Sequence, residues 1–400
     1  MPLFDLPEIK QTKPQTTGPN IKLKKGQTIN DLVSIATQLV NEKLGKYRDK
    51  SKCVTDIKVL KTFFDNTVDI VAIDTETTGL NYFTDELVGF SVCNGVDSLY
   101  IPLNHKSAIY NTKLVGQIPE DEIRTLLLDI KKTRPDIKFV YHNAKFDLAV
   151  FRTFLGECMP DPWWDTMLAG HLFDQNSEHS LKYLYNRYIA VEDEGVNRFD
   201  ALFHGITFDY IPLNIATIYG GKDALMTYEL YKYQKEQFDK KEFHKLYEVF
   251  RNIEMPLLPI LEDMQRTGVN LNQKMLKQQY DKYNAKLQEY ENLVYKEIEP
   301  YKEQIQTYRV EHYKDKLDDP INIGSPAQLS ILFYKIIGYK TKSGKGTGVH
   351  ELEEINSPLT NALLEYRKAL KLIDAFLVAL PKRIEPTTGK IHTSLNQYRS

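Results

Sequence analysis

The chain has 400 residues, of which 42% are apolar and 26% are charged, and its formal net charge is −2. This length predicts two or three domains, and the composition is typical of globular proteins. No apolar run approaches the ~18 residues needed to cross a bilayer. The N-terminus lacks the features of a signal peptide, so the sequence argues against membrane-spanning and secreted classes.

The distribution of charge limits how a nucleic acid could bind, and the spacing of the cysteines indicates the redox environment. The net charge is +5 over residues 1–52, −9 over 53–253 and +2 over 254–400. A nucleic-acid partner would therefore bind local basic patches rather than a global positive field. The three cysteines lie far apart without a CxxC pair, which favours a reducing interior and argues against a structural zinc site.

The N-terminal part begins with an arm and a helix and then changes to strands. Residues 1–28 mix Pro, Thr, Gly and Lys without a period, which predicts a flexible arm. The apolar spacing over 29–48 predicts an amphipathic helix. Residues 68–74 form a short apolar run, typical of a buried strand, and we expect 87–94 and 98–104 to be its hairpin neighbours.

Helices alternate with strands farther along the chain. The pattern predicts helices over 120–132, 143–155 and 211–238 and a buried strand over 137–142. This alternation is typical of a mixed α/β sheet. We expect the helix over 211–238 despite the pair Gly220-Gly221 in its interior.

The C-terminal part is predicted to be mainly helical. Residues 273–316 form a long, charged, Tyr-rich helical region that we expect to break at Pro300. Ser325 is the expected N-cap of a further helix, with Gln328 completing a capping box. A last helix is expected over 359–384.

Two carboxylates come at the end of the predicted strand. Asp74 and Glu76 are two residues apart, so they point to the same side of a strand. Two like charges this close repel, whereas a divalent cation between them turns the repulsion into ligation. Magnesium is held by a few carboxylates together with water and phosphate oxygens. The pair therefore suggests a metal site, although such a pair alone occurs often by chance.

Two helical pairs could complete this site. Asn143 and Asp147 are four residues apart and share a face of one predicted helix, and Tyr219 and Asp223 are four apart on another. Taken alone, each pair more often consists of exposed side chains without a functional role. With the strand pair they provide four carboxylates and a phenol around two magnesium ions, an arrangement suited to phosphodiester hydrolysis.

Three segments carry these residues: VAIDTETTGL (71–80), VYHNAKFDL (140–148) and IYGGKDALMTYELY (218–231). They resemble the three exonuclease motifs of family A DNA polymerases, in the subclass with tyrosine in the third motif. The resemblance covers about residues 55–400, through WWDTMLAGHLFD, HSLKYLYNRY, IEMPLLPILEDMQRTGVNLN, INIGSPAQLSILFYKIIGYKTKSGKG, LLEYRKALKLIDAFLVALP and GKIHTSLNQ.

The resemblance implies a fold and three regions. The fold would be α/β, a ribonuclease H-like 3′→5′ exonuclease domain with a mixed sheet flanked by helices, followed by a mainly α-helical thumb. The regions would be the exonuclease domain over 53–245, the thumb-like helices over 246–385 and an incomplete start of the palm over 386–400. Composition and apolar spacing add an N-terminal basic arm and helix over 1–52, for which the family offers no counterpart.

The resemblance also implies roles in catalysis. Asp74 would bridge the two metals, Glu76 and Asp223 would complete the tighter site, and Asp147 would hold the second metal. Glu76 would also help to orient the attacking water, to which Tyr219 would hydrogen-bond.

Other residues would position the substrate. The resemblance implies that Thr77, Leu80, Asn143 and Phe146 hold the terminal nucleotide, with Leu80 wedged beside the last base and Asn143 near the sugar-phosphate. We also expect Asp165, which follows Trp163 and Trp164, to support the site indirectly.

A basic glycine-rich stretch over 339–349 carries Lys340, Lys342 and Lys345 and no acid. Its glycine spacing excludes a phosphate-binding P-loop, and a plain exposed loop is the simplest interpretation. The resemblance implies that these lysines contact duplex phosphates, which would add affinity without sequence preference.

The function implied is a 3′→5′ DNA exonuclease that proofreads for a family A DNA polymerase during replication. It would use two Mg²⁺ ions, with Mn²⁺ as a substitute, to hydrolyse the 3′-terminal phosphodiester and release a deoxynucleoside monophosphate. Its partners would be single-stranded 3′ ends, primer–template duplex and the polymerase palm and fingers, in the same chain or a separate one. We expect a cytoplasmic location in a bacterium or a phage-infected cell.

Two alternatives stay open. One is a catalytically inactive DNA-holding module of a polymerase, which the complete set of acids argues against. The other is a free-standing nuclease resembling ribonuclease D, which the thumb-like segment argues against. None of the polymerase's catalytic motifs lies in these 400 residues, so polymerisation would require the palm and fingers.

Overall fold

The computed structural model describes residues 24–191, 198–312, 315 and 317–398. The chain divides into two compact units. The sheet unit contains Met1–Thr267 and Ser394–Ser400, and the helical unit contains Gly268–Thr393. The flexible arm predicted over 1–28 falls outside the described residues as far as residue 23. Among the described helices, none combines the length and apolar character needed to span a bilayer.

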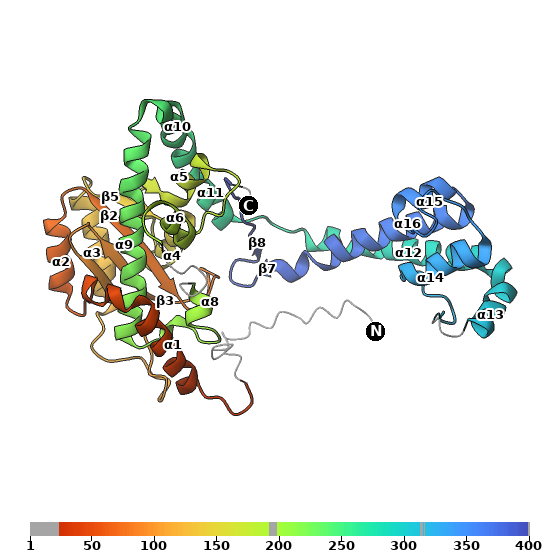
Figure 1. The fold of residues 1–400 in the computed structure, drawn as a ribbon, viewed down its shortest axis with the longest axis horizontal. Coiled ribbons are helices and arrows are strands. Elements are labelled where there is room, and N and C mark those ends of the chain that lie inside the picture. The colour runs from red at the N-terminus through yellow and green to blue at the C-terminus, as the bar shows by residue number, and fades with distance from the viewer. Residues whose placement is uncertain (1–23, 192–197, 313–314, 316, 399–400) are drawn as a thin grey trace. The chain divides into compact units, whose positions relative to one another are not determined.

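One six-stranded mixed sheet organises the sheet unit (Figure 1). Its strands are β1 (Ser51–Cys53), β2 (Ile70–Thr77), β3 (Leu87–Cys93), β4 (Ser98–Pro102), β5 (Lys138–Tyr141) and β6 (Trp164–Asp165). Their order across the sheet is β1-β4-β3-β2-β5-β6. The neighbours β2, β3 and β4 are antiparallel, as predicted, whereas β5 lies parallel to β2. The predicted mixed α/β architecture is therefore confirmed.

Helices cover both faces of this sheet. They are α1 (Ile29–Leu44), α2 (Ile57–Asn66), α3 (Glu120–Thr133), α4 (Ala144–Leu155), α5 (Thr166–Phe173), α6 (Leu181–Tyr188), α8 (Phe199–Leu202), α9 (Leu213–Phe238), α10 (His244–Val249) and α11 (Met255–Thr267). On β4, Leu99 and Ile101 belong to a core shared with α2 and α3, whereas Tyr100 belongs to a core shared with α1 and α9. Because successive strand residues point to opposite faces, Tyr100 packs on the other side of β4 from Leu99 and Ile101.

The long helix α9 approaches the sheet closely through its two glycines. A Cβ atom on Gly220 would lie 2.8 Å from the ring of Tyr100, and one on Gly221 would lie 2.5 Å from Oγ of Ser51. Any larger side chain would push α9 away from β1 and β4. The packing gained by this contact explains why glycine is found here, although it costs about 1 kcal/mol in a helix interior.

The helical unit is mainly α-helical, as predicted. It contains α12 (Gln273–Ile298), α13 (Lys302–Glu311), α14 (Pro326–Ser330), α15 (Val349–Ile355), α16 (Pro358–Leu372) and a small hairpin of β7 (Ile384–Glu385) and β8 (Lys390–Ile391). A 3₁₀ turn at Glu299–Tyr301 separates α12 from α13, which is the break predicted at Pro300. Ile298, Leu332 and Leu363 share the core of this unit.

One capping prediction in the helical unit is wrong. Ser325 caps α14 as expected, because its Oγ accepts a hydrogen bond from the Gln328 amide. The Gln328 side chain does not accept a hydrogen bond from the Ser325 amide, as a capping box requires. Its Oε1 accepts from the Asn322 amide at 2.9 Å, and its Nε2 donates to Asp318 at 2.6 Å. Partners in the preceding loop therefore replace the second half of the capping box.

Candidate metal centre

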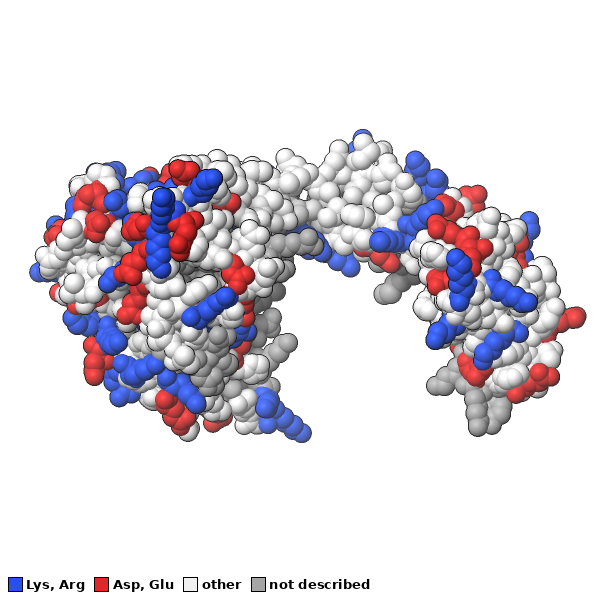
Figure 2. Space-filling view, turned by 45° about the horizontal axis from the view of Figure 1, so that its top comes forward, with Lys and Arg blue, Asp and Glu red and all other residues white. Residues whose placement is uncertain are grey.

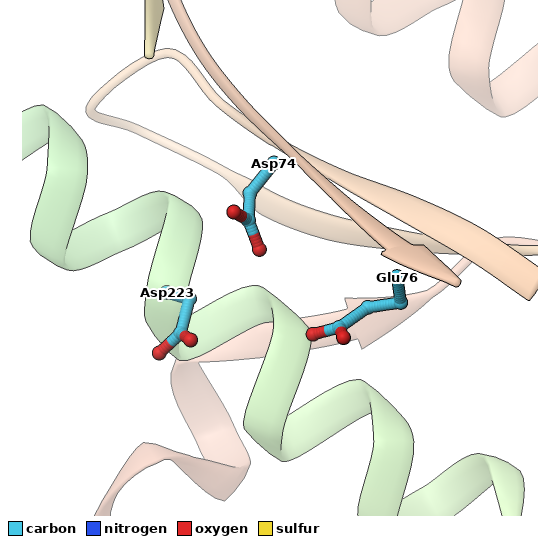
Figure 3. A group of neighbouring side chains, drawn as sticks. All are labelled: Asp74, Glu76 and Asp223. Carbon is cyan, nitrogen blue, oxygen red and sulfur yellow. The ribbon is translucent and has the colours of Figure 1, made fainter. Parts of the chain in front are cut away.

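Three carboxylates meet where β2 passes α9 (Figure 3). Asp74 and Glu76 point to the same side of β2, and Asp223 lies near them on α9. Ligand oxygens of the three residues all lie within 4.8 Å of one another. The structure thus brings together three of the four acids that the sequence singled out, from two elements far apart along the chain.

Burial and mutual repulsion make the negative charges of these acids costly. Burial, and then the charge of Asp223, raise the pKa of Asp74 from 3.8 to about 7. Burial, followed by the charges of Asp74 and Asp223, also raises the pKa of Glu76 well above its usual range. A divalent cation among these oxygens would neutralise the repulsion and find the hard ligands that it prefers. The donor set therefore fits a divalent metal.

Two lysines that the sequence analysis did not single out lie beside the acids. Lys222 Nζ lies 2.7 Å from Asp223 Oδ1, and Lys182 Nζ forms an ion pair with Asp223 Oδ2. Burial alone would raise the pKa of Asp223, but the two ammonium groups hold it below its usual value. The sequence could have indicated both lysines. Lys222 adjoins Asp223, and Lys182 lies in HSLKYLYNRY, one of the segments that carry the family resemblance.

The fourth acid, Asp147, lies beside the group of three rather than within it. It sits in the first turn of α4, where its Oδ1 accepts hydrogen bonds from the Thr75 amide at 2.9 Å and from the Thr75 hydroxyl at 2.7 Å. Burial, and then the charge of Asp74, raise the pKa of Asp147. The expected convergence of four acids is therefore found for three, and Asp147 is bound to the strand residue between Asp74 and Glu76.

Asp165 fixes the start of the helix that carries this fourth acid. Its Oδ2 accepts from the Ala144 amide at 2.8 Å. Its Oδ1 accepts from the amides of Asn143, Met167 and Leu168 at 3.2, 2.8 and 3.2 Å. Burial raises the pKa of Asp165, and these amide donors oppose that rise. One buried carboxylate therefore joins the first turns of α4 and α5.

Asn143 does not share a helix face with Asp147, contrary to the prediction. It precedes α4 as the N-cap residue in the left-handed conformation, with φ of 68°. The chain turns sharply there between β5 and α4, and asparagine adopts this conformation more readily than most residues do. The Asn143 side chain therefore projects from the turn before α4 rather than from a face of the helix.

The other proposed substrate residues lie on β2 and α4, which carry three of the four acids, or directly after β2. Leu80, just beyond β2, is 85% exposed. Thr77 ends β2, and its Oγ1 donates to the Gly79 carbonyl at 2.6 Å. Phe146, in α4, is half-buried and packs against the core.

Tyr219 lies one helical turn before Asp223 and packs among aromatic rings. The centroid of the Phe203 ring is 5.0 Å from its own. The ammonium groups of Lys182 and Lys222 lie 5.3 and 4.9 Å from its ring centroid. Burial, and then the nearby carboxylates, raise the pKa of Tyr219 well above its usual range. The phenol therefore keeps its proton and can donate a hydrogen bond.

The three lysines of the basic stretch are found in the helical unit. Lys340, Lys342 and Lys345 are all exposed, on the loop that precedes α15. The Lys342 amide donates to Glu354 at 3.1 Å, which anchors part of the loop. On the face drawn in Figure 2, acidic and basic side chains are interspersed over each unit. A polyanion would therefore meet scattered positive side chains on that face rather than a continuous positive surface.

These raised pKa values predict how metal and pH act on stability. Because the folded state holds protons on Asp74 and Glu76 that the unfolded state releases, the free energy of unfolding should fall as pH rises from about 4 through 7. A divalent cation binds the deprotonated acids, so Mg²⁺ should raise the melting temperature more at pH 8 than at pH 5. Thermal denaturation with EDTA or MgCl₂ measures both effects.

An Asp74→Asn variant is the control for this prediction. The difference in pH dependence between the natural chain and this variant excludes the contributions of the many other groups that titrate in the same range. The variant should show a flatter pH dependence in EDTA and a smaller response to Mg²⁺. An equal or larger response to Mg²⁺ at pH 5 would contradict the assignment.

Comparisons with known proteins agree with this fold and site. A family model described as 3′-5′ exonuclease matches residues 52–239, and one described as DNA polymerase family A matches residues 272–400. The fold and the acidic site thus define a 3′–5′ exonuclease domain joined to the first part of a polymerase domain. The chain belongs to the family A DNA polymerases, which confirms the resemblance seen in the sequence.

Several curated relatives are bacterial or phage DNA polymerases. DNA polymerase I of Chloroflexus aurantiacus is 28% identical over 341 residues, covering 82% of this chain and 33% of the relative. DNA polymerase I of Bacillus subtilis is 26% identical over 359 residues, covering 87% and 36%. The DNA polymerase of Bacillus phage SP01 is 26% identical over 338 residues, covering 74% and 35%. The chain spans about a third of the length of these relatives.

A solved structure also shares the fold. It is described as the POL domain of Pol1 from M. smegmatis in complex with DNA primer-template and dNTP, and it aligns with a TM-score of 0.60 at 17% identity. The alignment covers 87% of this chain and 53% of that one.

Proposed function

We propose that this chain is a magnesium-dependent 3′→5′ DNA exonuclease that proofreads for a family A DNA polymerase. The observation that carries the proposal is the meeting of Asp74, Glu76 and Asp223 within 4.8 Å, in the part of the chain that matches the exonuclease family. Asp147, bound to the intervening strand residue, supplies the fourth acid.

The acids and Tyr219 would act on the metals and the attacking water. Asp74, Glu76, Asp147 and Asp223 would hold two Mg²⁺ ions, with Mn²⁺ as a substitute. Bound metals supply an activated water and stabilise charge on the attacking and leaving oxygens. The protonated phenol of Tyr219 would donate a hydrogen bond to the attacking water, and the Glu76 carboxylate would help to orient it.

The neighbouring side chains would hold the frayed 3′ end. Leu80 is exposed beyond β2, so it can wedge beside the last base without disturbing the core. Thr77, Asn143 and Phe146 would position the terminal nucleotide, with Asn143 near the sugar-phosphate. The product is a deoxynucleoside monophosphate.

The partners proposed follow from the relatives. The solved relative binds a primer-template, and we propose single-stranded 3′ ends and primer–template duplex as the substrates of this chain. The remaining palm and fingers would act with it in cis or as a separate polypeptide. The bacterial and phage sources of the relatives support a cytoplasmic location.

Degradation of end-labelled oligonucleotides tests this function. The chain should shorten 5′-labelled single-stranded DNA from its 3′ end in Mg²⁺ or Mn²⁺, release monophosphates and stop in EDTA. A matched RNA oligonucleotide should be degraded much more slowly. Preference for RNA would favour a ribonuclease D-like enzyme, and binding of DNA without degradation would favour an inactive holding module.

The exposed lysines of the helical unit predict a salt-dependent contact with duplex DNA. Replacing Lys340, Lys342 and Lys345 together by alanine should make the plot of log affinity against log salt shallower by about 3, since each lost phosphate contact removes about 0.9. Fluorescence anisotropy with duplexes of two sequences measures this slope, and the loss should be equal for both.

A charge-matched control separates this contact from a general effect of net charge. It removes three exposed lysines of the sheet unit: Lys240, Lys241 and Lys245. This control should leave the slope unchanged. Equal losses in the two triple variants would reject a phosphate contact specific to the basic loop.

A further inference from the structure

Both oxygens of Asp223 are engaged by ammonium groups within the acidic site. Lys222 Nζ is 2.7 Å from Oδ1, and Lys182 Nζ is paired with Oδ2. A metal ion that takes an oxygen of Asp223 must therefore share it with a lysine or displace one. The positive charge of either lysine also repels an incoming dication.

The two lysines reach this carboxylate from different elements. Lys222 precedes Asp223 on α9, and its side chain is 0% exposed. Lys182 lies on α6, which packs against α9 through Leu184 and Met226. Its side chain is 12% exposed. Lys182 therefore has a path to solvent that Lys222 lacks.

Without a metal, the lysines are needed to balance the acids. Asp74, Glu76 and Asp223 carry up to three negative charges in a cluster of two buried acids and one half-buried acid, and the two ammonium groups offset two of them. A metal supplies the same compensation. The lysines and the metal are thus alternative counter-ions for one set of carboxylates.

We propose that Lys182 is a built-in counter-ion that competes with the divalent metal for Asp223. It stabilises the site when no metal is bound, it leaves Oδ2 when a metal binds, and it thereby lowers the affinity of the site for metal. Lys222 remains buried beside Oδ1. Lys182 acts through Asp223 as a positioning residue, and this inference rests on the metal site of the proposed function.

Measurement of metal affinity and metal-free stability together tests this exchange. Chelator-stripped Lys182→Met should bind Mn²⁺ about tenfold more tightly in isothermal titration calorimetry, while its melting temperature in EDTA falls. The rise in melting temperature on adding Mn²⁺ should consequently exceed that of the natural chain. A purely structural role for Lys182 would weaken metal binding and stability together, so the opposite signs identify competition.

Control variants separate charge from packing. Lys182→Arg keeps the charge and should retain the affinity of the natural chain. Arg187→Met removes a cation from the same helix, where Arg187 pairs with Asp174 at 2.9 Å, and it should leave Mn²⁺ affinity unchanged. Should Lys182→Met fail to fold, Lys182→Gln removes the charge while keeping a hydrogen-bond donor, and the same tighter binding is expected.

The outcomes distinguish this inference from the proposed function. Equal or weaker Mn²⁺ binding by a folded, charge-removing variant overturns the competition, even where the natural chain binds Mn²⁺ and degrades DNA. Failure of the natural chain to bind Mn²⁺ at all overturns the proposed function and the competition with it. Tighter binding by Lys182→Met but not by Arg187→Met supports the competition.

Discussion

Asp74→Ala is expected to lower the rate of 3′-end degradation by about a thousandfold or more. Asp74 is the proposed bridge between two metal ions, and metal stabilisation of transition-state charge is worth several kcal/mol. Each 1.36 kcal/mol corresponds to a tenfold change in rate. The measurement is single-turnover digestion of a 5′-labelled single-stranded oligonucleotide at saturating Mg²⁺.

The same substitution should leave the fold intact. Burial and the charge of Asp223 raise the pKa of Asp74 to about 7. At pH 8 the carboxylate of Asp74 is therefore ionised in an unfavourable environment, which lowers the stability of the metal-free protein. Removing it relieves repulsion with Glu76 and Asp223, and the melting temperature in EDTA should not fall. Loss of activity then reports chemistry rather than unfolding.

A surface acid supplies the matched control for this substitution. Asp129 is exposed on α3, and Asp129→Ala should degrade DNA at the rate of the natural chain. A folded Asp74→Ala variant with undiminished activity would remove the basis of the proposed function.

Local patterns predicted the elements because their causes are local. The apolar run ending at Asp74 became a buried strand, and the spacing of Tyr219 and Asp223 placed both on α9. The glycine pair looked unfavourable for a helix when only helix propensity was considered. Its explanation is tertiary, because a Cβ at Gly221 would meet Ser51, about 170 residues away in sequence.

The details of the site depend on partners that local patterns do not reveal. The pairing of Lys182 with Asp223 requires α6 to pack on α9, and the hydrogen bonds from Thr75 to Asp147 join β2 to α4. The left-handed Asn143 likewise follows from the tight connection between β5 and α4. The four acids were therefore assigned correctly to β2, α4 and α9, whereas the position of Asn143 and the contacts that set charge and orientation required the assembled fold.

Asp165→Ala is expected to be the most destabilising single change near the site, by on the order of 4 kcal/mol. It removes the acceptor of four backbone amides at the start of α4 and α5. Each buried donor left unpaired costs about 1–3 kcal/mol. Relief of the desolvation of this buried carboxylate, whose pKa burial raises, offsets part of that loss. Urea denaturation followed by circular dichroism measures the change.

Activity should fall in Asp165→Ala even under conditions where the variant is folded, because α4 carries Asp147. When the first turn of α4 loosens, Asp147 no longer holds its place beside Thr75, and the affinity for metal drops together with the rate. Asp165→Asn keeps one acceptor oxygen for three of the amides but sets an NH₂ group against the Ala144 amide, so its loss of stability should be intermediate. An Asp165→Ala protein with the stability and metal affinity of the natural chain would show that the start of α4 is held by other contacts.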